Sequence, residues 1–260
     1  MITLTMTKIS IITVVYNNME CIENAIQSAS SQTYPNIELI VVDGFSTDGT
    51  INVIEENIAN VDIFISEPDK GIYDALNKGI VQASGDVIAI LHSDDQFYDE
   101  HVVSDMMVHI EKTKSEVCFA DMVIVDKLSG QVLRFYMANY FKKWMFRIGW
   151  MPPHPACFIK KSLFNEFGMY STNYKVAGDF DLLVRFFYGR KIRWSYLDRI
   201  SVKMSSGGAS NSGWQSKKLI FNEINQVLKY NNVWSLPIFQ LGRYFIRLLE
   251  MLIKPGIKKI

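Results

Sequence analysis

The sequence predicts an α/β fold in which the first half of the chain forms a mostly parallel sheet with helices on both faces. Four short apolar runs, rich in isoleucine and valine, alternate with segments in which apolar residues recur at helical spacing. This alternation is typical of parallel sheets, because each connecting helix packs on a face of the sheet. At 260 residues the chain is long enough for one large domain with an additional segment.

Four buried strands and three helices are predicted for the first half. The apolar runs at 9–16, 37–42, 62–65 and 86–91 have the length and composition of buried strands. Helical spacing marks the segments between them. Its apolar positions are Ile22, Ala25, Ile26 and Ala29, then Ile51, Ile54 and Ile58, then Ile72, Ala75, Leu76, Ile80 and Ala83.

The second half is predicted to extend this sheet with antiparallel or mixed strands. We expect strands at 116–120, 122–125, 131–137 and 155–160, and helices at 103–110 and 180–187. Residues 139–155 are rich in aromatic and cationic side chains. The sequence shows no internal repeat and no low-complexity linker.

Polar side chains stand where the predicted parallel strands end. Tyr16 and Asp43 follow the first two strands, and Asp94 and Asp95 follow the fourth. Ligands of open α/β sheets bind beyond the carboxyl ends of the strands, so we expect these side chains to converge on one crevice. Two adjacent carboxylates suit a hard cation such as Mg²⁺ or Mn²⁺. The alternative is a plain turn, because aspartate and serine favour turns.

Composition and charge argue against several other classes of protein. The formal net charge is zero, so the chain lacks the overall basic signature of a nucleic-acid-binding protein. Three widely spaced cysteines predict neither a disulfide framework nor a zinc site, which favours the cytosol. The first ten residues do not have the pattern of a signal peptide. No apolar run reaches the roughly 18 residues of a membrane-spanning helix.

Several segments, in this order and spacing, resemble the family 2 glycosyltransferases with the GT-A fold. They are IITVVYNN (11–18), SQTYPNIE (31–38), VVDGFSTDGT (41–50), SEPDKGIYDALNKGI (66–80) and ASGD (83–86). The fourth segment is similar to a subgroup that builds bacterial surface polysaccharides. The resemblance implies a Rossmann-like mixed sheet with a catalytic domain at 1–210 and a helical tail at 211–260. Within that domain, about 1–98 would bind the nucleotide and 99–210 would face the acceptor.

The resemblance implies roles for the residues at the strand ends. Asp43 corresponds to the carboxylate that accepts a hydrogen bond from uracil, and Tyr16 to the residue that packs on or beside the base. Asp94 and Asp95 correspond to the family's DxD-type motif, with Asp95 as metal ligand and Asp94 near the ribose or the metal. His92 stands where a first aspartate is common in that motif. Metal binding could therefore depend on one direct carboxylate.

The presumed catalytic base of the family corresponds to Asp179, with Asp181 as the second choice. Gly178 replaces the glutamate that precedes the base in the family's Glu-Asp pair. A carboxylate beside the acceptor hydroxyl can take its proton as the sugar is transferred. At a helix start, the positive end of the helix dipole would favour the ionised form of Asp179. A helix N-cap is the alternative role for this residue.

Further donor contacts are expected from the resembling segments. Val14, Asp69, Lys70 and Asn77 are assigned to the nucleotide, and Lys70 or Lys78 would neutralise the diphosphate. Asn77 and Lys78 could equally form the polar face of their helix.

Two other segments have open assignments. His154, between two prolines, would contact the donor diphosphate, the metal or the acceptor, unless its loop is only structural. The Gly- and Ser-rich segment 205–211 is either a lid that orders on donor binding or a plain loop.

The tail has the pattern of an amphipathic helix with a basic edge. Its apolar positions are Leu241, Tyr244, Phe245, Leu248, Leu249 and Leu252, and Lys254, Lys258 and Lys259 follow. Such a helix can lie in a membrane interface. Residues 139–150 could form a second contact there. The alternatives are packing against the catalytic domain or against a dimer partner.

The expected function is that of an inverting, metal-dependent glycosyltransferase, hexosyl or N-acetylhexosaminyl, that uses Mn²⁺ or Mg²⁺. The resemblance implies a UDP-sugar as donor and a lipid-linked saccharide of polysaccharide or O-antigen biosynthesis as acceptor. It also implies a peripheral position on the inner face of the bacterial cytoplasmic membrane. An inactive nucleotide-sugar-binding module is the alternative, suggested by His92 and Gly178. A sugar nucleotidyltransferase ranks last, because its glycine- and arginine-rich phosphate loop is missing near the N-terminus.

Overall fold

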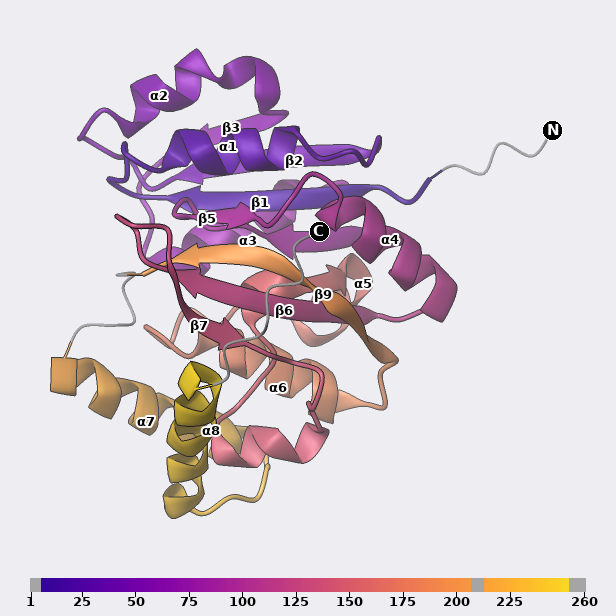
Figure 1. The fold of residues 1–260 in the computed structure, drawn as a ribbon, viewed down its shortest axis with the longest axis vertical. Coiled ribbons are helices and arrows are strands. Elements are labelled where there is room, and N and C mark those ends of the chain that lie inside the picture. Colours follow the sequence, from indigo (N-terminus) through magenta and orange to yellow (C-terminus); the bar gives the residue numbers. More distant parts are fainter. Residues whose placement is uncertain (1–5, 207–212, 253–260) are drawn as a thin grey trace.

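The computed structural model describes residues 6–206 and 213–252, which form a mixed sheet surrounded by helices (Figure 1). In this part of the chain the sheet has nine strands in the order β3-β2-β1-β4-β8-β6-β9-β5, and β7 pairs with β6. The strands are β1 (Ile9–Val15), β2 (Ile37–Asp43), β3 (Ile63–Ser66), β4 (Val87–Ile90), β5 (Asp95–Phe97), β6 (Val117–Val125), β7 (Val132–Tyr136), β8 (Cys157–Lys160) and β9 (Trp194–Ser205).

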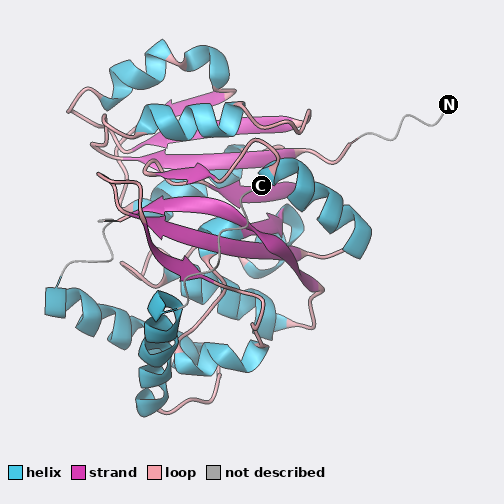
Figure 2. Ribbon diagram, viewed as in Figure 1, coloured by secondary structure: helices cyan, strands magenta, loops and turns pink. Residues whose placement is uncertain are grey.

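Helices lie on both sides of this sheet (Figure 2). The α-helices are α1 (Ile22–Ser30), α2 (Thr50–Glu56), α3 (Ile72–Gln82), α4 (Val102–Thr113), α5 (Lys161–Phe167), α6 (Gly178–Gly189), α7 (Gly213–Tyr230) and α8 (Leu241–Leu252). Short 3₁₀ turns are η1 (Ile58–Asn60), η2 (Lys143–Ile148), η3 (His154–Ala156) and η5 (Pro237–Gln240).

The alternating side chains of β1 divide the interior into two hydrophobic cores. Ile9, Ile11 and Val15 pack in one core with apolar residues of α1 and α4. Ile12 and Val14 point to the other face and pack with α3 and α6. Successive residues of a strand point to opposite faces, so a strand that is apolar throughout needs a helical layer on each side. The predicted α/β fold with helices on both faces is confirmed.

The first half of the sheet is parallel, and the second half is mixed, as the sequence predicted. β1 pairs in parallel with β2 and β4, and β2 pairs in parallel with β3. β8 joins the halves by pairing antiparallel with both β4 and β6.

One predicted strand boundary is wrong, because β6 continues through the position where two strands were expected. Its register against β9 shifts on either side of Asp121. The Asp121 carboxylate is buried, and it accepts hydrogen bonds from Ala138 N at 2.7 Å and from Tyr196 Oη at 3.0 Å. A polar residue inside a strand is tolerated when both its oxygens are satisfied, so the strand does not break there.

Two elements of the second half were not predicted at all, namely α5 and β9. Most side chains of β9 are only half-buried, so the strand lacks the apolar run by which buried strands are recognised. Arg199 in this strand pairs with Asp99 at 2.7 Å and also with Asp105, which ties β9 to the segment around α4. The second helix is also shorter than predicted, since α2 ends at Glu56 and Ile58 begins η1.

The tail contains the expected helical structure in its described part, as α7 and α8. Both lie at the end of the molecule opposite α2, with α8 beside β7 (Figure 1). Of the helices that the structure describes, none has the length and apolar character to cross a membrane. Residues 207–211 of the expected lid, and Lys254, Lys258 and Lys259, lie outside the described residues.

Candidate active site

The carboxyl ends of the parallel strands meet at one edge of the sheet. Val15, the last residue of β1, pairs with Asp43, the last residue of β2. The loops after β1 and β4 are joined by a hydrogen bond of 2.9 Å that the Asn18 amide donates to Ser93 Oγ. Loops from three strands therefore form one surface, which includes Tyr16 and the Asp94–Asp95 pair.

Asp43 is a buried residue that holds the loop after β2 in place. It has no exposed surface, and all four of its hydrogen bonds come from the chain itself. Its Oδ2 accepts from Phe45 N at 3.1 Å, Ser46 N at 3.0 Å and Ser66 Oγ at 2.7 Å, and its Oδ1 accepts from Ser46 Oγ at 2.5 Å. A carboxylate used in this way organises its loop, so the geometry does not favour the expected contact of Asp43 with a base.

Asp69 and Tyr16 offer a ring and a carboxylate at the same edge. Tyr16 is 64% exposed, and Asp69 is half-buried with Oδ1 accepting a hydrogen bond from Gly71 N at 2.7 Å. Gly44 lets the two approach the β2 loop: a Cβ there would lie 2.5 Å from Asp69 Oδ2 and 3.3 Å from Tyr16 Cδ2. Asp69 Oδ2 and the Tyr16 ring therefore both lie against the backbone of Gly44.

The other residues assigned to the nucleotide have different surroundings. Val14 is buried in β1. Both polar atoms of the Asn77 side-chain amide bond to the backbone of Tyr170. Asn77 Nδ2 donates to the Tyr170 carbonyl oxygen at 2.8 Å, and Asn77 Oδ1 accepts from the Tyr170 N–H at 2.9 Å. Lys78 Nζ donates to Pro68 O at 2.7 Å and pairs with Glu67 at 2.9 Å. Lys70 is exposed, so of the two lysines it is the better candidate to neutralise a diphosphate.

Asp95 is a buried carboxylate without a partner, and this fits a cation site. It begins β5 and is 1% exposed, yet neither carboxylate oxygen has a hydrogen bond. Burial raises its pKa well above the usual range, and the neighbouring charge of Asp94 raises it further, while the backbone N–H of Ser205, which lies too far or too poorly aligned for a normal hydrogen bond, acts weakly in the opposite direction. Leaving a buried charge unpaired is unfavourable, and a divalent cation is a partner that two adjacent carboxylates suit.

The protein ligands for such a cation are few. Within residues 6–206 and 213–252, no group of three or more His, Cys, Asp and Glu side chains could hold a metal. Magnesium and manganese commonly complete their shells with water and substrate phosphate, so one or two carboxylates suffice when a diphosphate is bound. His92, at the expected first aspartate position, is half-buried with a buried and unpartnered Nδ1, and desolvation lowers its pKa.

Asp179 lies in the first turn of α6 with surroundings unlike those of an N-cap. The N-cap position is Ala177, and Asp179 Oδ1 accepts a hydrogen bond from Phe180 N at 2.7 Å. Burial raises the pKa of the Asp179 carboxyl to about 6, although hydrogen bonds to it act in the opposite direction. The expectation that the helix start would favour the ionised form is wrong in its net direction, because desolvation outweighs it.

Asp181, the second choice for the base, is already paired. It is 2% exposed, and its Oδ2 accepts from Arg185 Nε at 2.8 Å while its Oδ1 accepts from Asn231 Nδ2 at 3.3 Å. The Arg185 guanidinium also bonds to the carbonyl oxygens of residues 167–169. This makes Asp181 a packing and anchoring residue, and Asp179 the one with free acid–base capacity.

Tyr73 is a site residue that the sequence did not identify. Its ring fills the space beside Gly178, where a Cβ would lie only 2.7 to 2.8 Å from three ring carbons. A hydrogen bond from Tyr73 also lowers the pKa of Asp179. The missing glutamate of the Glu-Asp pair therefore has a physical explanation, since no side chain fits at 178 while Tyr73 is present. In the sequence, the only sign of this contact is Gly178, which stands where the family has a glutamate.

His154 lies beneath the same site and not at its surface. It is buried, and its Nε2 is 2.6 Å from the Tyr170 hydroxyl, whose ring stacks on Tyr73 with 5.7 Å between centroids. Burial lowers the pKa of His154 to about 3, with a smaller effect from nearby His92. Buried rings thus connect the surroundings of Asp179 with those of the Asp94–Asp95 pair.

Glu223 in α7 is a second residue that sequence reasoning missed. Its buried carboxylate accepts three backbone hydrogen bonds of 2.9 Å, from the N–H groups of Lys175, Val176 and Ala177. These residues lead directly into α6, so Glu223 fixes the approach of the chain to Asp179. A single glutamate in an amphipathic helix carries no sequence signal for this role.

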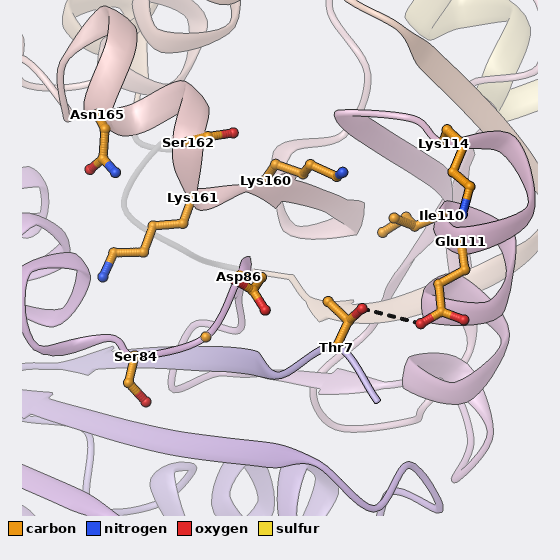
Figure 3. Close-up of a pocket in the computed structure, with 11 residues that line it drawn as sticks. Thr7, Ser84, Asp86, Ile110, Glu111, Lys114, Lys160, Lys161, Ser162 and Asn165 are labelled. Carbon is orange, nitrogen blue, oxygen red and sulfur yellow. Dashed lines mark hydrogen bonds between the residues drawn. The ribbon is translucent and has the colours of Figure 1, made fainter. Parts of the chain in front are cut away.

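A separate cleft of about 610 Å³ lies at the opposite edge of the sheet (Figure 3). Its walls come from the segments that precede β1 and β4, from the end of α4, and from the start of α5. Lys114, Lys160 and Lys161 line it together with Asp86 and Glu111, so its charges are mixed (Figure 3). None of the predicted site residues lines this cleft.

Comparisons with known proteins identify the family and the fold of the chain. The family model described as glycosyl transferase family 2 matches residues 10–166. A glycosyltransferase of Mycobacterium tuberculosis, described as uncharacterized, is 31% identical over 186 residues, or 68% of each chain. A Mycobacterium bovis protein described as a PGL/p-HBAD biosynthesis glycosyltransferase is 27% identical over 208 residues, which are 78% of this chain and 79% of the relative.

Solved structures share the fold at low sequence identity. Staphylococcus aureus TarS 1–349 in complex with UDP-GlcNAc has a TM-score of 0.67 and 20% identity, over 92% of this chain and 73% of that one. Mannosyltransferase PcManGT from Pyrobaculum calidifontis, in complex with GDP-Man and Mn²⁺, has a TM-score of 0.61 and 16% identity, over 96% and 81%. With a family model spanning more than half of it and a GT-A-like mixed sheet, this chain belongs to glycosyl transferase family 2.

Proposed function

We propose that this glycosyltransferase moves a sugar from a UDP-sugar to an acceptor hydroxyl, with inversion at the anomeric carbon and with the help of a divalent cation. The proposal rests mainly on two aspartates, Asp95 and Asp179, whose different surroundings suit different roles. Asp95 has two buried oxygens without partners, and Asp179 has a pKa raised to about 6 by burial. The first suits a cation and the second suits a proton acceptor.

Tyr16 and Asp69 are the proposed base contacts. The exposed Tyr16 ring would stack on the uracil, and Asp69 Oδ2 would accept a hydrogen bond from the uracil imide N–H. This assignment transfers to Asp69 the role expected for Asp43, whose oxygens are already used. The UDP-GlcNAc in the TarS complex supports a uridine donor, although PcManGT holds GDP-Man on the same fold.

Asp95 is the proposed cation ligand, with Asp94 as the second carboxylate beside the ribose or the cation. A bound Mn²⁺ or Mg²⁺ would neutralise charge that develops on the diphosphate leaving group. The Mn²⁺ in the PcManGT complex supports such a site in this fold. The exposed Lys70 is placed to add positive charge to the diphosphate.

Asp179 is the proposed base that takes the proton of the acceptor hydroxyl. Its pKa of about 6 leaves it mostly ionised at neutral pH while still basic enough to accept a proton. A base on the face opposite the leaving group allows one direct displacement, which inverts the anomeric carbon. Tyr73 and Glu223 hold this carboxylate and its helix in place, and Arg185 removes Asp181 from the reaction.

The proposed acceptor is a lipid-linked saccharide at the inner face of a bacterial cytoplasmic membrane. In this proposal residues 1–98 bind the nucleotide, 99–210 face the acceptor, and 211–260 form the helical tail. The relative described by PGL/p-HBAD biosynthesis supports a role among glycoconjugates. An inactive nucleotide-binding module stays as the second candidate because of His92, whereas family membership argues against the nucleotidyltransferase.

The first test is calorimetric titration with UDP, dTDP and GDP, each with Mn²⁺ and with EDTA. We expect UDP to bind in Mn²⁺ and to lose roughly tenfold or more in affinity in EDTA, because the diphosphate then lacks its counter-charge. If none of the three nucleotides binds in Mn²⁺, both the enzyme and the binding-module candidates fail. Release of UDP from a UDP-sugar in Mn²⁺ separates these two, since only the enzyme turns over.

A second titration distinguishes Asp69 from other acidic residues of its loop. Asp69→Ala should weaken UDP binding roughly tenfold or more, because a charge-assisted hydrogen bond to the base is lost. The matched control is Glu67→Ala, which removes an exposed carboxylate two residues away. Equal affinities of Asp69→Ala and wild type would reject Asp69 as the base contact.

A further inference from the structure

Helix α8 buries two of its three charged residues and exposes most of its large apolar ones. Arg243 and Glu250 are almost completely buried, at 3% and 2% exposure. On the other side of the same helix, Leu241, Phe245 and Leu248 are 60%, 64% and 54% exposed. Soluble proteins normally bury the apolar face of an amphipathic helix. This orientation therefore raises two questions: what fixes it, and what the exposed apolar face binds.

Buried polar contacts fix the orientation of α8. Glu250 Oε1 accepts a hydrogen bond from the Tyr140 hydroxyl at 2.9 Å, and Glu250 Oε2 is 3.4 Å from Arg134 Nε of β7. At the start of the helix, the buried Gln240 donates to Asn225 Oδ1 of α7 at 2.5 Å. Rolling the helix to hide its leucines would carry Glu250 away from Arg134 and Tyr140, and it would leave the Arg134 guanidinium, only 17% exposed, without its carboxylate partner, which is unfavourable.

The outward residues of α8 continue into a larger apolar surface, which we call the α8 face. The segment before the helix adds exposed Trp234, Leu236 and Ile238, and the two segments pack together. The complete α8 face comprises Trp234, Leu236, Ile238, Phe239, Leu241, Phe245, Leu248, Leu249 and Met251. A contiguous exposed apolar surface of this kind marks an interaction site.

The exposed charged side chains of residues 215–251 and of η2 are all of one sign. Between residues 215 and 251 the exposed charged side chains are cationic, namely Lys217, Lys218, Lys229 and Arg247. The two carboxylates of this stretch, Glu223 and Glu250, are buried. The adjoining η2 turn adds exposed Lys143, Trp144 and Arg147 and contains no acidic residue. The chain as a whole is neutral, so this is a local accumulation of positive charge.

We infer that the α8 face docks the enzyme on an anionic lipid surface. Apolar side chains enter the acyl boundary, tryptophans suit the headgroup level, and the surrounding cations attract anionic headgroups. A second copy of the chain is a poorer occupant, because it would bring two cationic borders together. The inference deepens the proposed function, in which the acceptor is lipid-linked, by identifying the surface that holds the enzyme beside it.

The test is flotation with vesicles of phosphatidylcholine alone and of phosphatidylcholine mixed with phosphatidylglycerol. Wild-type protein should float with the mixed vesicles and much less with the neutral ones. Raising the salt from about 0.1 M to about 1 M should weaken binding, because the screening length falls from about 10 Å to about 3 Å. Absence of flotation with the mixed vesicles would overturn the inference.

A pair of matched variants locates the contact. Phe245→Ser with Leu248→Ser should lower the partition to mixed vesicles by roughly tenfold or more, since two large apolar side chains no longer enter the lipid. The control is Val108→Ser, which replaces a 60% exposed valine of α4. Equal loss in both variants would reject the α8 face as the docking surface. A stable dimer in light scattering that the double variant abolishes would assign this face to a second copy instead.

Titration of both variants with UDP and Mn²⁺ keeps the two proposals apart. Intact UDP binding without vesicle binding would defeat only the docking surface. Vesicle binding without any UDP binding would defeat only the proposed donor.

Discussion

Strands β2 and β5 both carry buried carboxylates, but the protein satisfies only those of β2. Glu38, near the start of β2, accepts hydrogen bonds from Lys8 Nζ at 2.8 Å, Ser10 Oγ at 2.5 Å and Ser84 N at 2.8 Å. Burial alone would raise its pKa, but these bonds outweigh it and lower the pKa to about 2. Asp43, at the end of the same strand, is equally well bonded.

Asp95 of β5 is buried to the same degree and has no such partners. This difference distinguishes carboxylates that stabilise the fold from carboxylates that bind a ligand. A carboxylate that the chain itself saturates is part of the scaffold, whereas one that the chain buries and leaves unpaired needs something from outside. The following variants challenge this distinction, beginning with the largest expected effect.

Asp179→Asn tests a carboxylate that the chain bonds only partly and whose pKa burial raises to about 6. We expect transfer to fall roughly 10²- to 10⁴-fold, because the amide cannot take the acceptor proton. Binding of UDP in Mn²⁺ should be close to that of wild type. Turnover would be followed by UDP release and binding by calorimetry. Parallel loss of binding and turnover would show that Asp179 supports the structure and is not the base.

Asp95→Asn should separate stability from function. In EDTA at pH 8 the variant should be more stable than wild type. The reason is that a carboxyl whose folded pKa is raised destabilises the protein above its unfolded pKa. Denaturant unfolding with and without Mn²⁺ measures both effects. Mn²⁺ should stabilise wild type and not the variant, and a destabilised variant in EDTA would contradict the comparison.

Asp43→Asn should have the opposite effect on stability. An amide nitrogen cannot accept the hydrogen bonds that converge on Asp43, so we expect a loss of about 1–3 kcal/mol in the free energy of unfolding. Urea denaturation measures it, and added UDP with Mn²⁺ should stabilise variant and wild type to a similar extent. A variant as stable as wild type but unable to bind UDP would restore the base contact to Asp43.

Tyr73→Phe should have the smallest effect, and a specific one. The Tyr73 hydrogen bond lowers the pKa of Asp179, so its loss should move the acidic limb of kcat/KM from about 6 to higher pH, by less than about one unit. Turnover well above this limb should change little. Tyr34→Phe, which removes a hydroxyl bonded to Thr7 O far from the site, is the control. A uniform decrease at all pH values would indicate lost packing only.

The sequence predicted best those elements that local hydrophobic periodicity determines by itself. The parallel half, the two helical layers and the edge that gathers Tyr16 and Asp94 follow from apolar runs and from the direction of parallel strands. β9 could not be found in this way, because its pairing depends on a neighbour 75 or more residues away and on half-buried side chains. Local periodicity contains no information about such partners.

Residue types alone also could not separate scaffold from site. Asp43 and Asp69 are both acidic residues in loops that resemble a known family, and only the hydrogen bonds show which is already used. The same holds for α8, whose amphipathic pattern was predicted while its inverted orientation depends on Arg134 and Tyr140, more than a hundred residues earlier.

The close packing of Tyr73 on Gly178 has an evolutionary consequence. Any side chain at position 178 would lie within 3 Å of the tyrosine ring, so no single substitution leads from this chain to the Glu-Asp form of the motif. The two positions must covary, with a larger residue at 178 accepted only after the ring at 73 becomes smaller. Related sequences should therefore divide into two lineages, and intermediates that carry both large residues should be absent.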